Sequence, residues 1–181
     1  MPEPTEKQRE RIALAAAVIE ETEKASADEI GKLLSAACTN FLAELDALSD
    51  SQAAFSYAEV EWSVSEVCRH LANATRLTAG GIQMLAQGAA VGDGKPAQMG
   101  VLDPDPGSFD AVRKSVEEAF DAYAQAVRAL EGEPSLKETL LHPLFGELNC
   151  RKLASFGILH INIHLAQLLR IKSAENFPAN A

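Results

Sequence analysis

The sequence has none of the features that would mark a membrane or nucleic-acid-binding protein. No apolar run approaches the roughly 18 residues that a membrane-spanning helix needs, so we expect no membrane partner. Basic residues are few: 16 Lys and Arg stand against 26 Asp and Glu, and the formal net charge is −10. Nucleic acids and anionic lipid surfaces are bound by clustered positive charge, so neither is an expected partner.

Cysteine is also scarce. Cys38, Cys68 and Cys150 are widely spaced and form no C-x-x-C motif, so they make no disulfide framework. We expect reduced, buried side chains in a cytoplasmic protein. The apolar segment 12–19 is followed at once by glutamates and has no small-residue cleavage pattern, so we do not expect it to be a signal peptide.

Aromatic residues make up only 6% of the chain, whereas Ala and Leu are abundant, and this composition favours helices. Apolar residues recur at three- and four-residue steps, and Ser, Thr or Asn stands at the start of each such segment. The predicted helices cover residues 5–24, 26–48, 63–87, 108–131 and 149–172. We expect a linker or a short turn of helix at 52–61, one helical turn at 135–141 and no strand.

The last four of these helices predict an all-α domain, a four-helix bundle, over residues 26–181. The segment 88–107 is rich in Gly, Pro and Asp and predicts a long crossover loop between two helices of the bundle. Residues 1–25 are expected to form an N-terminal helical extension that packs on the bundle or on a partner subunit.

The histidines are the residues most suggestive of chemistry. His160 and His164 are one helical turn apart on an apolar face, so both imidazoles can reach one metal ion. An imidazole on such a face is costly unless its nitrogens are satisfied. His70 lies beside the apolar stripe of another long helix. Two ligands from one helix and one from another suit tetrahedral Zn²⁺ or a related divalent ion, with one position left for water.

Two well-known helical metal motifs are absent. A metalloprotease helix needs Glu directly after its first His, but Ile161 stands there. A di-iron carboxylate bundle needs Glu-x-x-His, but Gly157 and Val67 occupy the glutamate positions. The candidate site is therefore poor in carboxylates.

Three motifs in order carry a family resemblance. They are W-S-x-x-E-V-x-x-H-L at 62–71, H-P-L-F-G-E-L at 142–148 and H-x-x-x-H-L-x-Q at 160–167. With this order and spacing, residues 26–172 resemble the DinB-like (DinB/YfiT) superfamily of metal-dependent enzymes. The resemblance implies an up-down-down-up bundle in which His70, His160 and His164 hold a divalent metal, zinc or nickel.

The resemblance also implies a homodimer. Characterised relatives include thiol-dependent S-transferases and an isomerase that uses a low-molecular-weight thiol, so such a thiol is an expected co-substrate. The chain departs from the family pattern at Leu153 and Leu165, where relatives often carry Trp and a basic residue, and in its N-terminal extension.

Two further residues are candidates for catalysis. Glu66 stands one turn before His70, where it would act as a general base on a metal-bound water. Its capping-box spacing from Ser63 explains it equally well. His142 precedes Pro143 in a turn, where it would serve as a proton carrier or fix the turn by a hydrogen bond.

Two classes of function follow. In the first, the protein is an enzyme whose three-histidine metal site promotes hydrolysis of a small molecule or transfer of a thiol onto it. In the second, it is a non-catalytic, stress-associated helical binding protein whose metal is structural or absent.

Overall fold

The computed structural model describes residues 5–58, 60–91 and 100–179. These residues form six α-helices, one 3₁₀ turn and one two-stranded hairpin. In chain order the elements are α1 (Glu6–Glu23), α2 (Ala27–Ala43), α3 (Asp50–Ala53), α4 (Val64–Ala86), α5 (Phe109–Val127), η1 (Arg128–Leu130), β1 (Leu140–His142), β2 (Gly146–Leu148) and α6 (Cys150–Lys172).

The helices begin where the capping residues predict. Thr5, Ser26 and Ser63 each form a capping box, in which the hydroxyl accepts from the third residue of the helix and that residue's side chain accepts from the cap. Asn149 caps α6 by accepting from two backbone amides. These local bonds satisfy amide groups that the helices themselves leave unpaired.

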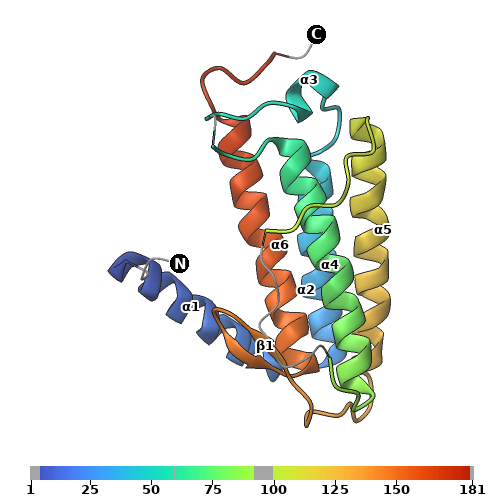
Figure 1. Ribbon diagram of the computed structural model, residues 1–181. Helices are drawn as coiled ribbons and strands as arrows, with labels where there is room; N and C mark the ends of the chain where they lie inside the picture. The colour runs from blue at the N-terminus through green and yellow to red at the C-terminus, as the bar shows by residue number, and fades with distance from the viewer. Residues whose placement is uncertain (1–4, 59, 92–99, 180–181) are drawn as a thin grey trace.

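Helices α2, α4, α5 and α6 form the bundle (Figure 1). α2 runs away from the hairpin end, α4 and α5 both run back towards it, and α6 runs away from it again. Because α4 and α5 are parallel, the chain must cross the length of the bundle between them. The predicted all-α class and up-down-down-up topology are confirmed. Of the predicted crossover loop 88–107, residues 92–99 lie outside the described residues.

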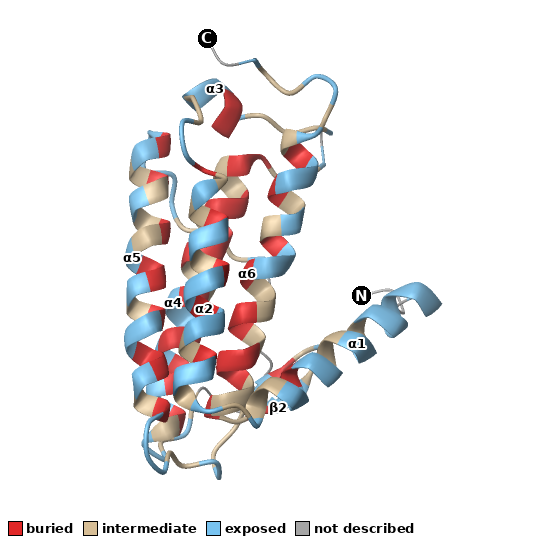
Figure 2. Ribbon diagram, turned by 180° about the vertical axis from the view of Figure 1, so that it is seen from behind, coloured by how far each residue is buried: buried red, intermediate tan, exposed pale blue. Residues whose placement is uncertain are grey.

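Buried residues face the inside of the bundle, as Figure 2 shows. Phe41 of α2 and Phe120 of α5 pack edge to face with ring centroids 5.9 Å apart. The hydroxyl of Tyr123 donates to the carbonyl of Ala154 and ties α5 to α6. Gly157 lies beside this contact, where a Cβ would collide with the Tyr123 hydroxyl. The close approach of the Tyr123 side chain to α6 therefore explains why position 157, where a di-iron motif would have Glu, is occupied by Gly.

Three local predictions are wrong. The segment 135–141 forms no helical turn: its last residues belong to β1, which pairs with β2 in an antiparallel hairpin. The expectation of no strand fails at the same place. The hairpin closes through Pro143 and Gly146, and Gly146 has a φ of 70°. α2 also ends at Ala43, earlier than predicted, and Ala47 adopts a positive φ in the turn that follows.

The extension helix α1 packs only its C-terminal part on the bundle. Ile19 is buried there, and Glu20 accepts from Lys152 of α6 at 2.6 Å. The N-terminal half points away from the bundle (Figure 1). Leu14 is 69% exposed, and Val18, in the C-terminal half beside Ile19, is 44% exposed.

Within the described ranges, none of the helices has both the length and the apolar character needed to cross a membrane.

Candidate metal centre

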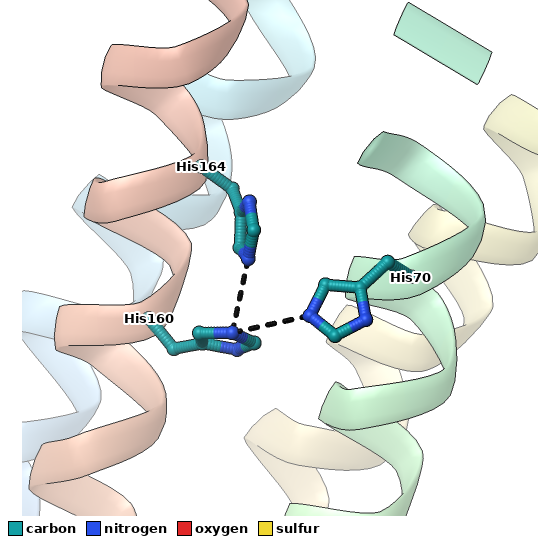
Figure 3. Close-up of side chains that lie close together, drawn as sticks. All are labelled: His70, His160 and His164. Atoms are coloured by element: carbon teal, nitrogen blue, oxygen red, sulfur yellow. Dashed lines mark hydrogen bonds between the residues drawn. The ribbon is translucent and has the colours of Figure 1, made fainter. Parts of the chain in front are cut away.

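Three histidines converge between α4 and α6 (Figure 3). His70 projects from α4, and His160 and His164 project from consecutive turns of α6. The Nε2 atom of His160 lies 3.4 Å from that of His70 and 3.0 Å from that of His164. The structure thus brings together the three residues that the sequence singles out as ligands.

The spacing of these nitrogens suits a single metal ion. Nitrogens bound to a tetrahedral ion at 2.0–2.1 Å lie about 3.3 Å from one another. One ligand atom from each of the three residues lies within 4.8 Å of the others. In the part of the chain that the structure describes, no other group of three His, Cys, Asp or Glu side chains meets this condition. The residues present therefore fit a divalent cation.

Hydrogen bonds from the opposite ring atoms fix two of the three imidazoles. The Nδ1 atom of His70 lies 3.0 Å from the carbonyl oxygen of Val101, which can only accept. The Nδ1 atom of His164 lies 2.9 Å from Oε1 of Gln167. Each ring then carries its proton on Nδ1 and directs the Nε2 lone pair towards the centre. Metal-binding histidines are typically held in this way.

Burial keeps the imidazoles in their neutral form, which is the form that binds metal. Burial lowers the pKa of His164 to about 4. The pKa of His160 falls to about 2, first through burial and then through the neighbouring His164 and His70. Burial also lowers the pKa of His70, against the opposing effect of its bond to Val101. At neutral pH the cluster is therefore ready to bind a cation without releasing protons.

Aromatic rings surround the cluster. The ring of Trp62 lies 4.8 Å from His70 and 6.3 Å from His164, measured between centroids. Phe156, one turn before His160, stacks on it at 5.4 Å. Trp62 begins the motif at 62–71, but the spacing of that motif does not show that its ring lies beside the candidate ligands. As the only tryptophan in the chain, it is a natural fluorescent reporter of this site.

A cavity of about 480 Å³ opens beside the histidines. α4, α6, the hairpin and the segment around Val101 all contribute to its wall. Its size lies in the range of small-molecule binding sites. Leu77 of α4 is 67% exposed and lines this cavity.

His142 also lines the cavity, from β1. Its Nδ1 atom accepts from the amides of Leu144 and Phe145 at 3.1 and 3.3 Å. Burial lowers its pKa to about 4. The ring therefore fixes the hairpin turn, as the second sequence interpretation predicts, and carries its proton on Nε2. A role in catalysis stays a prediction.

Glu66 forms part of the capping box of α4. One of its carboxylate oxygens accepts from both the amide and the hydroxyl of Ser63, at 2.8 and 2.9 Å. It is not among the residues that line the cavity. The capping interpretation accounts for the residue, and its role as a base stays a prediction.

Sequence reasoning missed the two hydrogen-bond acceptors. Gln167 follows His164 at i+3, a spacing that permits contact on a helix, but solvation explains a glutamine there equally well. Val101 acts through its backbone carbonyl, and a backbone group leaves no residue-type signal in a sequence.

Both the sequence and the fold of the chain resemble those of known proteins. The family model for the DinB superfamily matches residues 33–168. Among solved structures, the chain is similar to YfiT from Bacillus subtilis, a probable metal-dependent hydrolase with an unusual four-helix bundle topology. The two are 13% identical, with a TM-score of 0.61 over 98% of this chain and 93% of YfiT. At this identity, the likeness to YfiT establishes the fold alone.

No curated protein matches the chain significantly. The family model nevertheless spans most of the sequence and includes all three histidines of the cluster. The chain therefore belongs to the DinB superfamily.

Proposed function

We propose that the protein is a metal-dependent hydrolase that acts on a small molecule, with His70, His160 and His164 as the metal ligands. The observation that carries the proposal is the convergence of three Nε2 atoms beside a cavity, with two of the rings fixed through Nδ1. The description of YfiT as a probable metal-dependent hydrolase supports the same reaction class. Zinc and nickel are the ions we propose.

When bound, a divalent cation of this kind supplies Lewis-acid chemistry: it makes water more acidic and polarises a carbonyl oxygen. Hydrolysis adds the water oxygen to the acyl carbon, breaks the bond to the leaving group and transfers a proton to that group. The three histidines hold the cation as neutral ligands. Trp62 and Phe156 place apolar rings against His70 and His160. A dry surrounding strengthens electrostatic interactions at the reacting bond.

His142 can assist without changing its charge. Because its Nδ1 atom accepts from the turn, its Nε2 carries the proton and is available as a neutral donor. We propose that it donates a hydrogen bond to the substrate or the leaving group inside the cavity. Glu66 remains the proposed alternative base, although its capping bonds favour a structural role.

As far as the structure describes it, the cavity offers no ionic partner for the carboxylates of a thiol co-substrate such as glutathione. Common low-molecular-weight thiols such as glutathione carry carboxylates, which are usually bound by Arg or Lys. Among the described residues that line the cavity, there is neither. A carboxylate-bearing thiol such as glutathione is therefore the less favoured co-substrate.

The test compares hydrolysis rates of a panel of small, uncharged 4-nitrophenyl esters. We expect the zinc- or nickel-loaded protein to exceed the chelated protein by about a hundredfold or more, and His164→Ala to fall to the chelated rate. Leu169→Gln, an exposed substitution on the same helix, should retain full activity. Equal rates with and without bound metal would instead favour the non-catalytic binding protein. Acceleration only on addition of glutathione, bacillithiol or mycothiol would indicate thiol transfer.

A further inference from the structure

The cavity beside the histidine cluster has a wall made mainly of apolar side chains. Phe156 and Ile163 come from α6, Leu77 from α4, and Leu144 and Phe145 from the hairpin turn. These elements are far apart in the sequence, so the apolar character does not arise from a single hydrophobic stretch. The histidine cluster occupies one part of the same cavity.

Several of these apolar side chains are exposed to solvent. Leu77 is 67% exposed, Ile163 49% and Leu144 41%. Single exposed leucines are ordinary, but a group from three separate elements around one cavity is typical of a ligand-binding surface. Exposure of these side chains is a cost that a bound apolar ligand would remove.

Charged side chains are absent from the described part of the wall. Its polar members, besides the four histidines, include Asn73 and Thr78, and Asn73 donates to Asp103 at 3.1 Å. The nearby Arg69 and Arg76 line a different cavity, together with Asp103. A charged group placed deep in the wall would lose its hydration without gaining an ionic partner, which is unfavourable.

We propose that this cavity binds an uncharged, apolar part of the substrate, an aryl or branched alkyl group, next to the bond that lies at the histidine cluster. The proposal rests on the proposed function for that bond, but the cavity itself can be tested without any metal. The polar end of the substrate faces the histidines, and the apolar group extends towards Leu77, Leu144 and Ile163. The substrates are therefore hydrophobic esters or amides rather than polyanions.

The first experiment uses the fluorescence of Trp62 in the full chain after chelation. The probe is 4-nitrobenzyl alcohol, whose nitroaromatic ring quenches tryptophan on contact, and its charged counterpart is 4-nitrobenzoate. We expect saturable quenching by the alcohol at concentrations at least about tenfold lower than by the benzoate, a factor of ten being 1.4 kcal/mol. Free N-acetyltryptophanamide gives the collisional background.

Two variants make this result specific. Leu77→Glu and Ile163→Glu place a carboxylate at the cavity on different helices, and both positions tolerate a charge because they are exposed. Each should weaken binding of the alcohol about tenfold or more, whereas Leu169→Glu, exposed on α6 outside the cavity, should not. Quenching that does not saturate, equal binding of alcohol and benzoate, or unchanged binding in both variants would overturn the proposal.

A second experiment separates this proposal from the metal site. Calorimetry on the zinc-loaded protein compares acetohydroxamate with benzohydroxamate, which share the metal-binding group and differ in the apolar part. We expect the aryl compound to bind about tenfold more tightly, and Leu77→Glu to erase that gain while acetohydroxamate binds as before. Equal affinities of the two hydroxamates for the zinc-loaded protein would overturn the proposed apolar site and leave the proposed metal site standing. If the protein takes up no zinc while the alcohol still quenches Trp62, the proposed function fails and the apolar site stands.

Discussion

At the scale of single residues, the site depends on which nitrogen of each imidazole carries the proton. The carbonyl of Val101 and the side chain of Gln167 accept from Nδ1 of His70 and His164, and both Nε2 lone pairs are thereby aimed at the same point. Without these acceptors the rings could adopt the other tautomer or rotate. Acceptors of this kind usually contribute an appreciable part of the metal affinity.

Gln167 allows a direct test of this contribution. Gln167→Leu removes the acceptor but keeps a side chain of similar size, so we expect zinc affinity to fall about 10- to 100-fold. Gln167→Glu keeps an acceptor and should keep the affinity. Competition with a chromophoric chelator measures both. An unchanged affinity of the leucine variant would show that Gln167 has no part in orienting His164.

The lowered pKa values predict how stability depends on pH. A histidine whose pKa is lower in the folded state contributes stability that is complete above its unfolded value of about 6.5 and lost as pH falls towards the folded value. The pKa of His142 is lowered to about 4, so its contribution disappears between these limits. Protonation of Nδ1 would also break its bonds to the amides of Leu144 and Phe145.

His142→Asn tests this contribution, because an asparagine oxygen can accept the same turn amides and does not titrate. We expect the chelated wild type to lose more unfolding free energy between pH 7 and pH 4.5 than the variant does, by about 2 kcal/mol. Urea denaturation at the two pH values measures the difference. Parallel losses in the two proteins would contradict the assignment.

The candidate ligands could be predicted at this scale because an i, i+4 pair has a fixed geometry on any helix. The choice of His70 depended on the apolar stripe of α4 together with the family resemblance. The acceptors could not be predicted, because a side-chain rotamer and a loop carbonyl depend on the complete fold.

At the scale of elements, the segment 100–107 holds one side of the site in place. Asp103 ties it to α4: its carbonyl accepts from Arg69 at 2.7 Å, and its carboxylate pairs with Arg76 and accepts from Asn73. Val101, two residues earlier, accepts from His70. The position of His70, a candidate metal ligand, is thus coupled to an ion pair outside the histidine cluster.

Asp103→Ala should loosen this attachment. We expect the zinc affinity to fall roughly tenfold. The helical content should change little, because α4 keeps its capping box and its buried face. Asp105→Asn is the comparison variant: Asp105 lies in the same segment, but its side chain is 65% exposed and its ion pair with Arg69 of α4 is long, at 3.8 Å. Equal affinity in wild type and Asp103→Ala would show that the segment does not position His70.

The hairpin is the element that sequence reasoning missed. Its strands are only three residues each, too short for a visible alternation of apolar and polar residues. Its stability comes from cross-strand pairing and from the ring of His142 within the turn. The helices were predictable because their stripes are long and each begins with a capping residue.

At the scale of the whole molecule, helix stripes alone predict a four-helix bundle but not its topology. The long crossover allows α4 and α5 to be parallel. The complete up-down-down-up order could be predicted only from the family resemblance. This order makes α4 and α6 antiparallel neighbours, which brings His70 to the histidine pair of α6.

The projecting half of α1 suggests how the whole molecule assembles. We propose a homodimer in which α1 covers a partner subunit, because Leu14 on the projecting half and Val18, one turn further along the helix, are both exposed. Light scattering at tens of micromolar should give twice the mass of the 19.3 kDa chain, and the double variant Leu14→Glu, Val18→Glu should give the monomer mass. A monomeric wild type would refute the dimer, and a dimeric variant would exclude α1 as its interface.

The central claim is that His70, His160 and His164 together bind one divalent ion. Native mass spectrometry of the chelated protein after addition of one equivalent of zinc or nickel tests it most directly. We expect one ion per chain in the wild type and in Leu169→Gln, and no retained ion in His70→Ala, His160→Ala or His164→Ala. A wild type that retains no ion, or three alanine variants that retain it as the wild type does, would show that these histidines do not form a metal site.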